Sequence, residues 1–384
     1  MKSKKQQYNI DDFLKEHELK LGEKEDYDIK PSAKYAVLKE ALNNYYETFK
    51  SGWGDNSKLC HFIIINEVHV SLNSANGHEY IMNCYNSIIH MQMFLELYIV
   101  DLLESIHPVL VKGKLNKEID LLNAITWKFD ESDFSNKKTI QFSDVLKRFE
   151  FLIDNDEHLP INLKVDKQFH FFKRHIKTIF TILEQRNTML HRGKGILKDF
   201  ALDLLWINHI IPLIIDILKL EERIPFLDKN TFCNLNVLKE LNSINLDHDY
   251  KDISKKDIFI RDLNRICHLK ELGRASFKNK LFMGEWGDER VKENFEEIHN
   301  KKIRDVAEFK AQLFHTNLNY FNMHKCPCCG CRTLLTHEPW TILAIKRDRL
   351  HKAECIYCSY SINVHIGEPN LHGIMDEEIF IYLD

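Results

Sequence analysis

Six of the ten cysteines of this 384-residue chain lie within one short stretch near its C-terminal end. The stretch contains a CPxCG turn at Cys326–Gly330 and a CxxC turn at Cys355–Cys358. Each such turn directs two sulfurs at one point, so two turns can present four thiolates tetrahedrally, with no open coordination position. Clustering of this kind in a large, lysine-rich chain indicates structural Zn²⁺ in a reducing compartment rather than disulfides. The expected ligands are Cys326, Cys329, Cys355 and Cys358.

The region around these cysteines resembles a zinc ribbon, with 25 residues between the two pairs of ligands. The β-branched runs THEPWTILAI and YSINVHI are expected to form strands of a small antiparallel β module. Cys328 and Cys331 form a second, overlapping CxxC, which leaves the choice of ligands in the first turn open. The module is locally basic, which fits a solvated face as well as contact with nucleic acid.

The rest of the chain has the composition of a helical protein. Glycine and proline number only 13 and 8, while 44% of the residues are hydrophobic and 29% are charged. Scarce glycine and proline disfavour a β sandwich or a glycine-rich nucleotide-binding fold. The formal net charge is −4, so binding of nucleic acid would require a local basic patch.

Apolar residues recur at helical spacing in five segments: residues 34–49, 78–106, 142–153, 169–183 and 197–220. Ser143 is the expected N-cap of the third segment, and Gly193 is the expected stop after the fourth. Pro212 predicts a bend in the fifth. The run HFIIINEVHV is compatible with a strand or with the start of a helix.

Two of these segments are apolar enough to be considered for a membrane. Both contain Asp or Glu together with His, which are costly in a bilayer, so we expect buried helices and no membrane partner. The N-terminus is polar and lacks an apolar signal segment. The sequence therefore predicts a cytoplasmic location.

These patterns predict a mainly α protein with a small C-terminal β zinc-ribbon module. Four parts are expected: an N-terminal arm and helix (1–54), a helical bundle (55–225), a mixed, mostly helical connecting region (226–320) and the zinc ribbon (321–384).

The segment EQRNTMLHRGKG, residues 184–195, closes the fourth helix. An arginine followed by a histidine five to seven positions later occurs three times, at Arg186–His191, Arg261–His268 and Arg332–His337, so this spacing alone is not specific. The first pair is distinguished by Asn187 and by its place at the end of a long amphipathic helix. The third lies within the zinc ribbon and is set aside, whereas the second remains a rival.

RNTMLHRG, near the end of a long helix in a bundle, resembles the signature of HEPN-domain proteins. Members are all-α bundles, commonly dimeric, and many are metal-independent endoribonucleases of toxin–antitoxin, CRISPR and anti-phage systems. The resemblance covers residues from about 60 to 222, and only the motif is specific. It implies an HEPN-like bundle, an RNA substrate, a homodimer, an antitoxin or defence-system partner, and catalytic roles for Arg186, Asn187 and His191.

The side chains fit this chemistry. Attack by the RNA 2′-hydroxyl, which gives a 2′,3′-cyclic phosphate, needs a proton acceptor, a proton donor and positive charge on the phosphorane, which histidine and arginine supply without a catalytic metal. Asn187 and His191 share a helix face, so the amide can orient the ring or hold a phosphate oxygen. Arg186 lies about 140° around the helix from His191, so two copies meeting at a dimer axis would focus both groups better than one.

Local charge also favours RNA. Residues 164–199 carry nine Lys and Arg against three Asp and Glu, a net charge of about +6, and Arg192, Lys194 and Lys177 are the expected RNA contacts. Glu96, in the middle of an apolar run, is expected to pair with Arg186 and support it.

Three other interpretations remain open at this stage. His191 at a helix C-terminus is favourable for the helix dipole without any chemistry, which fits a silent HEPN and zinc-ribbon module that binds nucleic acid or a protein. A DNA-binding regulator that uses the zinc ribbon is the second. A metal-dependent nuclease is less favoured, because no cluster of carboxylates has ligand spacing.

Overall fold

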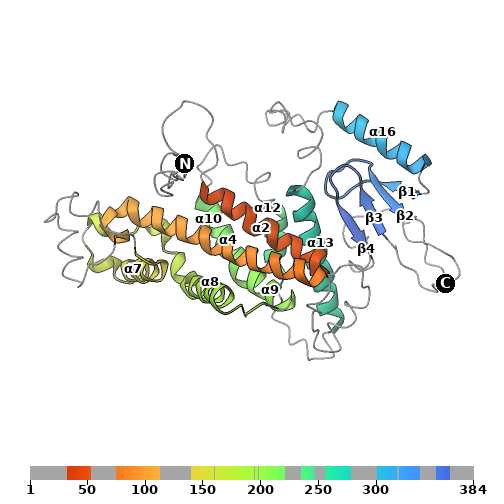
Figure 1. The fold of residues 1–384 in the computed structure, drawn as a ribbon. Coiled ribbons are helices and arrows are strands. Elements are labelled where there is room, and N and C mark those ends of the chain that lie inside the picture. Colours follow the sequence, from red (N-terminus) through yellow and green to blue (C-terminus); the bar gives the residue numbers. More distant parts are fainter. Residues whose placement is uncertain are drawn as a thin grey trace, which may run out of the picture. The chain divides into compact units, whose positions relative to one another are not determined.

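The computed structural model describes residues 33–52, 75–112, 140–159, 161–193, 195–197, 199–220, 235–244, 246, 256–277, 301–317, 320–337 and 352–363. Within these ranges the protein is mainly helical, with a small antiparallel sheet near the C-terminal end (Figure 1). The predicted N-terminal arm, the run HFIIINEVHV and Lys194 lie outside the described residues.

Two long helices, α2 (Ala33–Gly52) and α4 (Ala75–Ile106), pack side by side along much of their length (Figure 1). Both were predicted from periodicity. Their contact is rich in aromatic rings, and the centroids of Tyr35 and Phe94 lie 6.2 Å apart. Helix α4 ends at Ile106, and Pro108 begins the short helix η1 (Pro108–Val111). Proline is favourable at the first position of a helix, because the N–H that it lacks would have no partner within the helix there.

Helix α7 (Phe142–Asp154) begins two residues earlier than a Ser143 N-cap requires. The N-cap is Gln141, whose carbonyl accepts from the N–H groups of Asp144 and Val145, and no side chain caps the helix. The Ser143 cap was therefore wrong. Phe142 is buried, and we attribute the earlier start to its packing in the core, which contributes more to the stability of a helix than a cap does. Short turns η2 (Asp156–His158), η3 (Ile161–Leu163) and η4 (Lys167–Phe169) follow.

Helix α8 (Phe172–Arg192) contains the RNTMLH segment at its C-terminal end. Its predicted apolar face is buried against α4 and α7, and the buried residues include Phe172, Ile176, Ile179 and Ile182. Gly193 ends the helix as expected, because its φ of +56° is readily adopted only by glycine. The N–H of Gly193 donates to the carbonyl of Met189 at 3.0 Å.

The last apolar segment forms α9 (Asp199–Leu205), a π-helical turn η5 (Trp206–Ile210) and α10 (Ile211–Leu220). The π-turn lies just before Pro212, where the missing N–H and the ring disrupt the α-helical pattern. Residues 201–220 are long and apolar enough to span a membrane by length and composition, but most of this stretch is buried inside the protein. As expected, it contributes core side chains such as Trp206.

The core extends beyond the predicted bundle into the connecting region. Helices α12 (Leu235–Asn242) and α13 (Lys256–Phe277) pack together, and α13 also packs against α2. Gly273 allows this close approach, because a Cβ there would lie 2.6 Å from the ring of Tyr46. One apolar cluster contains side chains from Tyr35 to Leu269. It therefore includes residues of the predicted N-terminal helix, the predicted bundle and the predicted connecting region. The boundaries between these three parts remain predictions.

The C-terminal part consists of α16 (Lys301–Asn317) and the strands β1 (Tyr320–His324), β2 (Leu334–His337), β3 (Lys352–Cys355) and β4 (Ser361–Asn363). The sheet is antiparallel throughout, in the order β1-β2-β3-β4. Of the two predicted strand segments, YSINVHI contains β4, and THEPWTILAI contributes its first two residues to β2 while the rest lies outside the described residues.

Candidate functional sites: a cysteine cluster and a groove on α8

The four expected metal ligands come together in space. The Sγ atoms of Cys326, Cys329, Cys355 and Cys358 all lie within 4.8 Å of one another. Two of the separations are 3.6 Å (Cys326 to Cys358) and 3.7 Å (Cys329 to Cys355). A tetrahedral ion with Zn–S bonds of about 2.3 Å would place its sulfurs about 3.8 Å apart. The cluster therefore has the size that a tetrahedral metal ion requires.

Two tight turns build this cluster. In the first turn, the Cys326 N–H donates to the Cys331 carbonyl at 2.8 Å, and the Gly330 N–H donates back to the Cys326 carbonyl at 2.9 Å. Gly330 has a φ of +71°, which explains why glycine stands there. In the second turn, the Ser359 N–H donates to the Cys355 carbonyl at 3.0 Å. These turns are the local structure that the two CxxC spacings predicted.

The structure also distinguishes the overlapping cysteines. The Cys328 thiol is directed at the backbone carbonyl of Leu272 on α13, 3.9 Å away. The Cys331 thiol lies 3.7 Å from the Cys329 carbonyl. Neither belongs to the group of mutually close sulfurs, so the geometry favours Cys326 and Cys329 as the pair from the first turn.

The electrostatics of the cluster fit a bound cation. Burial raises the pKa of the Cys326 thiol, whereas hydrogen bonding with Cys326 lowers the pKa of Cys329. Four adjacent thiols cannot all ionise without a neutralising charge, because like charges at this distance repel in a buried site. A divalent ion supplies that charge, and an all-thiolate set is one that Zn²⁺ accepts readily. The cluster can hold a metal ion, and its donor set fits structural zinc.

The second site is an open groove of about 410 Å³ along the C-terminal half of α8. Asn187 and His191 both line it, as their spacing of four residues predicted. The described lining residues are Phe180, Leu183, Glu184, Asn187, Thr188, His191 and Arg192. His191 and Arg192 are exposed, and Asn187 is half-buried. The lining thus combines the apolar Phe180 and Leu183 with the carboxylate of Glu184 and with amide, imidazole and guanidinium groups.

Arg186 does not line the groove, but its side chain reaches the next residue. Its Nη1 donates to Oδ1 of Asn187 at 2.9 Å. Its Nε is buried and has no hydrogen-bond partner among the described residues. The expected ion pair between Glu96 and Arg186, both of which are described, is not formed: Glu96 accepts instead from the amide of Gln92 at 2.6 Å. The guanidinium is therefore not neutralised by that carboxylate.

The net positive charge of the predicted basic patch is smaller in the structure than the count from the sequence suggested. Lys173 pairs with Asp154 at 2.8 Å, and Arg174 pairs with Asp216. The sum of about +6 counted no acidic residue from neighbouring helices. Lys177 and Arg192 are exposed, and within the described part of the chain neither takes part in an ion pair. Among the described residues, Lys177, Arg192 and Arg186 contribute positive charge near the groove, and Glu184, which lines it, contributes a negative charge.

The chain that follows α8 folds back along this helix, which sequence reasoning missed. The amide of Gln185 donates to the carbonyl of Gly195, and the hydroxyl of Tyr80 donates to the carbonyl of Leu197 at 2.8 Å. Gly195 has a φ of +83°, and a Cβ there would lie 3.0 Å from Thr188. The second glycine of the GKG segment was the only signal for this turn.

The rival pair Arg261 and His268 is not arranged as a site. His268 is buried on α13, and its Nδ1 lies 2.9 Å from the hydroxyl of Tyr360. Arg261 is exposed and lies 3.9 Å from Asp262. The buried ring contacts the C-terminal module, so His268 has a packing role, and the pair does not resemble the open arrangement on α8.

Comparison with models of known protein families, with curated proteins and with solved structures finds no match to this chain. What the protein does must therefore be inferred from the side chains of its two sites.

Proposed function

We propose that this protein is a metal-independent endoribonuclease with an HEPN-like helical bundle, whose site lies on the C-terminal half of α8. The observation that carries the proposal is that Asn187 and His191 line one open groove together with Arg192. The Arg186 guanidinium lies against Asn187. Histidine, amide and arginine groups on one surface are the set that cleavage by the RNA 2′-hydroxyl requires.

In this reaction the 2′-oxygen attacks the adjacent phosphorus as its proton leaves, and the bond to the 5′-oxygen breaks as that oxygen is protonated. The products are a 2′,3′-cyclic phosphate and a 5′-hydroxyl. His191 performs a proton transfer, because an imidazole ring can accept a proton at one nitrogen and donate one from the other. Arg186 and Arg192 stabilise the charge that develops on the phosphorane. Asn187, held by Arg186, orients the ring or a phosphate oxygen.

The groove also offers a path for a single strand. Its lining includes Phe180, and aromatic rings stack on unpaired bases of any sequence. Lys177 and Arg192 are exposed cations on the same helix that can contact backbone phosphates. An unpaired RNA segment fits this combination better than a duplex, whose bases are not available for stacking.

A homodimer would complete this site. Arg186 and His191 diverge around α8, so one copy directs them at different points. The described surface of α4 and α8 carries exposed apolar side chains that a second copy would cover, namely Met82, Met93, Leu97 and Leu190.

Within this proposal the protein is a cytoplasmic toxin or anti-phage effector, restrained by an antitoxin or a defence-system partner. The metal bound by the four cysteines is structural Zn²⁺.

The test is cleavage of end-labelled single-stranded RNA by full-length protein in the presence of EDTA, with the zinc content checked in the same buffer. His191→Ala should lower the rate by at least about 100-fold, the usual contribution of a positioned acid or base. His158→Ala is the matched control, because it removes another exposed histidine outside the groove. Equal cleavage by wild type and His191→Ala would refute the proposal, and RNA binding without cleavage would favour a binding module.

A further inference from the structure

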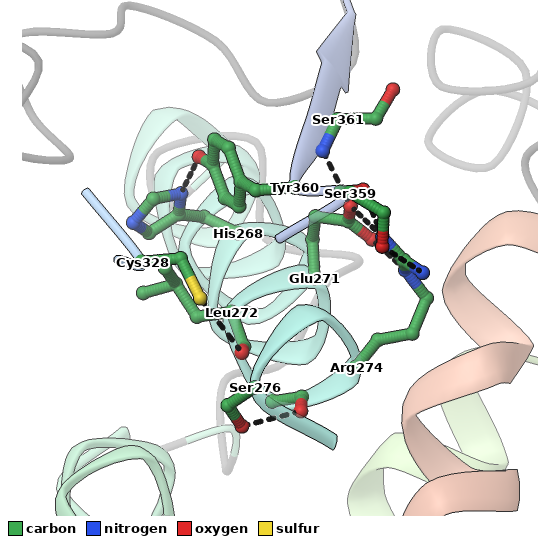
Figure 2. A network of polar contacts seen from close by, with 10 residues as sticks. His268, Glu271, Leu272, Arg274, Ser276, Cys328, Ser359, Tyr360 and Ser361 are labelled. Carbon is green, nitrogen blue, oxygen red and sulfur yellow. Dashed lines mark hydrogen bonds and ion pairs between the residues drawn. The ribbon is translucent and has the colours of Figure 1, made fainter. Parts of the chain in front are cut away.

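A buried ion pair on α13 contacts Ser359 and Ser361, which follow the second cysteine pair (Figure 2). Glu271 and Arg274 are joined by two hydrogen bonds, of 2.6 Å and 2.7 Å, and their side chains are 0% and 4% exposed. Burial alone would lower the pKa of Arg274, but the hydrogen bonds and charge of Glu271 outweigh it and raise the pKa. The Arg274 guanidinium is thus charged beside a fully buried carboxyl group.

Both members of this pair also hydrogen-bond to the backbone that follows Cys358. Arg274 donates to the carbonyl of Ser359, and Glu271 accepts from the N–H of Ser361 at 2.6 Å (Figure 2). Ser359 has a φ of +62°, a conformation that residues other than glycine adopt at some cost. The ion pair therefore holds the second cysteine turn in a conformation that the chain does not favour locally.

Two further contacts join α13 to the same module. The hydroxyl of Tyr360 lies 2.9 Å from Nδ1 of His268, and the Cys328 thiol is directed at the Leu272 carbonyl (Figure 2). One apolar cluster combines Ala275 of α13 and Phe49 of α2 with the buried cysteines. Both cysteine turns thus rest on one helix, which itself packs into the helical core.

We propose that Glu271 and Arg274 are positioning residues for the metal site and that metal binding and docking of the cysteine module on α13 are one coupled equilibrium. The pair fixes the backbone that aims the Cys355 and Cys358 sulfurs, in the way that groups behind metal ligands orient them. Because coupling is reciprocal, the metal in turn stabilises α13 against the core. This inference does not rest on the ribonuclease proposal, since it concerns different residues.

The experiment compares zinc release to a chromogenic chelator from zinc-loaded full-length wild type and Glu271→Gln. The variant should release zinc about 10- to 100-fold faster, as expected when a group that orients the ligands is lost. Cobalt(II) substitution should show weakened visible bands of tetrahedral thiolate coordination, which a purely structural role would leave unchanged. Because Glu271→Gln leaves Arg274 buried without its partner, the double variant Glu271→Gln/Arg274→Met is measured beside it.

Two control variants on the same helix separate this effect from general destabilisation. Arg265→Met breaks an exposed ion pair with Glu240, and Ile266→Val removes a buried methyl group outside the network. Both should release zinc at the wild-type rate. Hydrogen exchange of wild type should show that residues 268–275 lose protection when zinc is removed, while α8 keeps its protection.

Any of the following outcomes would overturn the proposal: a full-length protein that binds no zinc, protection of residues 268–275 that does not depend on zinc, or wild-type zinc release from the double variant with its helical content intact. Release as fast from Ile266→Val as from the double variant would also overturn it, because global stability would then explain the effect.

Discussion

The ammonium group of Lys270 on α13 lies 2.9 Å from the carboxylate of Asp203 on α9, and both side chains are almost fully buried. The same carboxylate accepts from the hydroxyl of Tyr45 on α2 at 3.0 Å. The ammonium group also lies 4.7 Å from the centre of the Tyr45 ring. One polar cluster thus joins three helices that are far apart in the sequence.

Removing one member of this cluster should be costly. Lys270→Met leaves the Asp203 carboxylate buried without its counter-ion, and the free energy of unfolding should fall by about 3–5 kcal/mol. The double variant Lys270→Met/Asp203→Asn should recover much of the loss, since the amide is neutral and still accepts from Tyr45. Urea unfolding measures both. A single variant as stable as the double variant would contradict this role.

The stability of the protein should fall at mildly acidic pH because of His175. Its Nε2 lies 3.0 Å from Asp216, with Arg174 and His209 nearby, and burial lowers the pKa of the ring below 6.5. The unfolded chain then binds a proton that the folded protein excludes. The contribution of His175 to stability is therefore complete above pH 6.5 and is lost as the pH falls towards its folded pKa.

This pH dependence can be measured by urea unfolding at about pH 5.5 and about pH 7.5. Wild type should be less stable at the lower pH, and His175→Gln should show a smaller difference, because the Gln side-chain amide reaches the position of Nε2 beside Asp216 but does not titrate. The same pH dependence in both proteins would assign it to other groups.

Metal content should distinguish the six clustered cysteines. Cys358→Ser should lose the bound zinc, because it removes one of four mutually close sulfurs. Cys328→Ser and Cys331→Ser should keep one zinc per chain. Elemental analysis of the purified variants provides the measurement. Loss of zinc from Cys328→Ser would mean that the overlapping CxxC supplies ligands.

A composite site at a dimer axis makes a quantitative prediction. Arg186→Ala and His191→Ala should each cleave at least about 100-fold more slowly than wild type when measured alone. If each site takes its arginine from one copy and its histidine from the other, subunit exchange gives half heterodimers, each with one intact site. Mixing should then restore about a quarter of wild-type cleavage. A mixture that stays as slow as the two variants alone after verified subunit exchange would place both residues in one chain's site.

The parts that could be predicted from the sequence are those controlled by nearby residues. The stop at Gly193 follows from a local backbone requirement, and the shared face of Asn187 and His191 follows from helical spacing. The cluster of four sulfurs follows from two short turns, each of which fixes two of them.

The parts that could not be predicted depend on distant segments. The partners of Lys173 and Arg174 are Asp154 and Asp216, which lie on other helices, so a local charge sum overstated the basic patch. The connecting region gave little signal, yet α13 links the core to the cysteine module. Glu271 and Arg274 look like an ordinary pair three residues apart on a helix. Only the fold places Ser359 and Ser361 beside them.

The chemistry of the fragment ends tests the central claim most directly. Full-length protein is incubated with a single-stranded RNA of defined sequence in EDTA, and its zinc content is verified. The account predicts fragments that end in a 2′,3′-cyclic phosphate and a 5′-hydroxyl, and no cut where the nucleotide before the scissile bond is 2′-deoxy. Fragments with a 3′-hydroxyl and a 5′-phosphate, or cleavage at the 2′-deoxy position, would contradict it, because the 2′-oxygen would then not be the nucleophile.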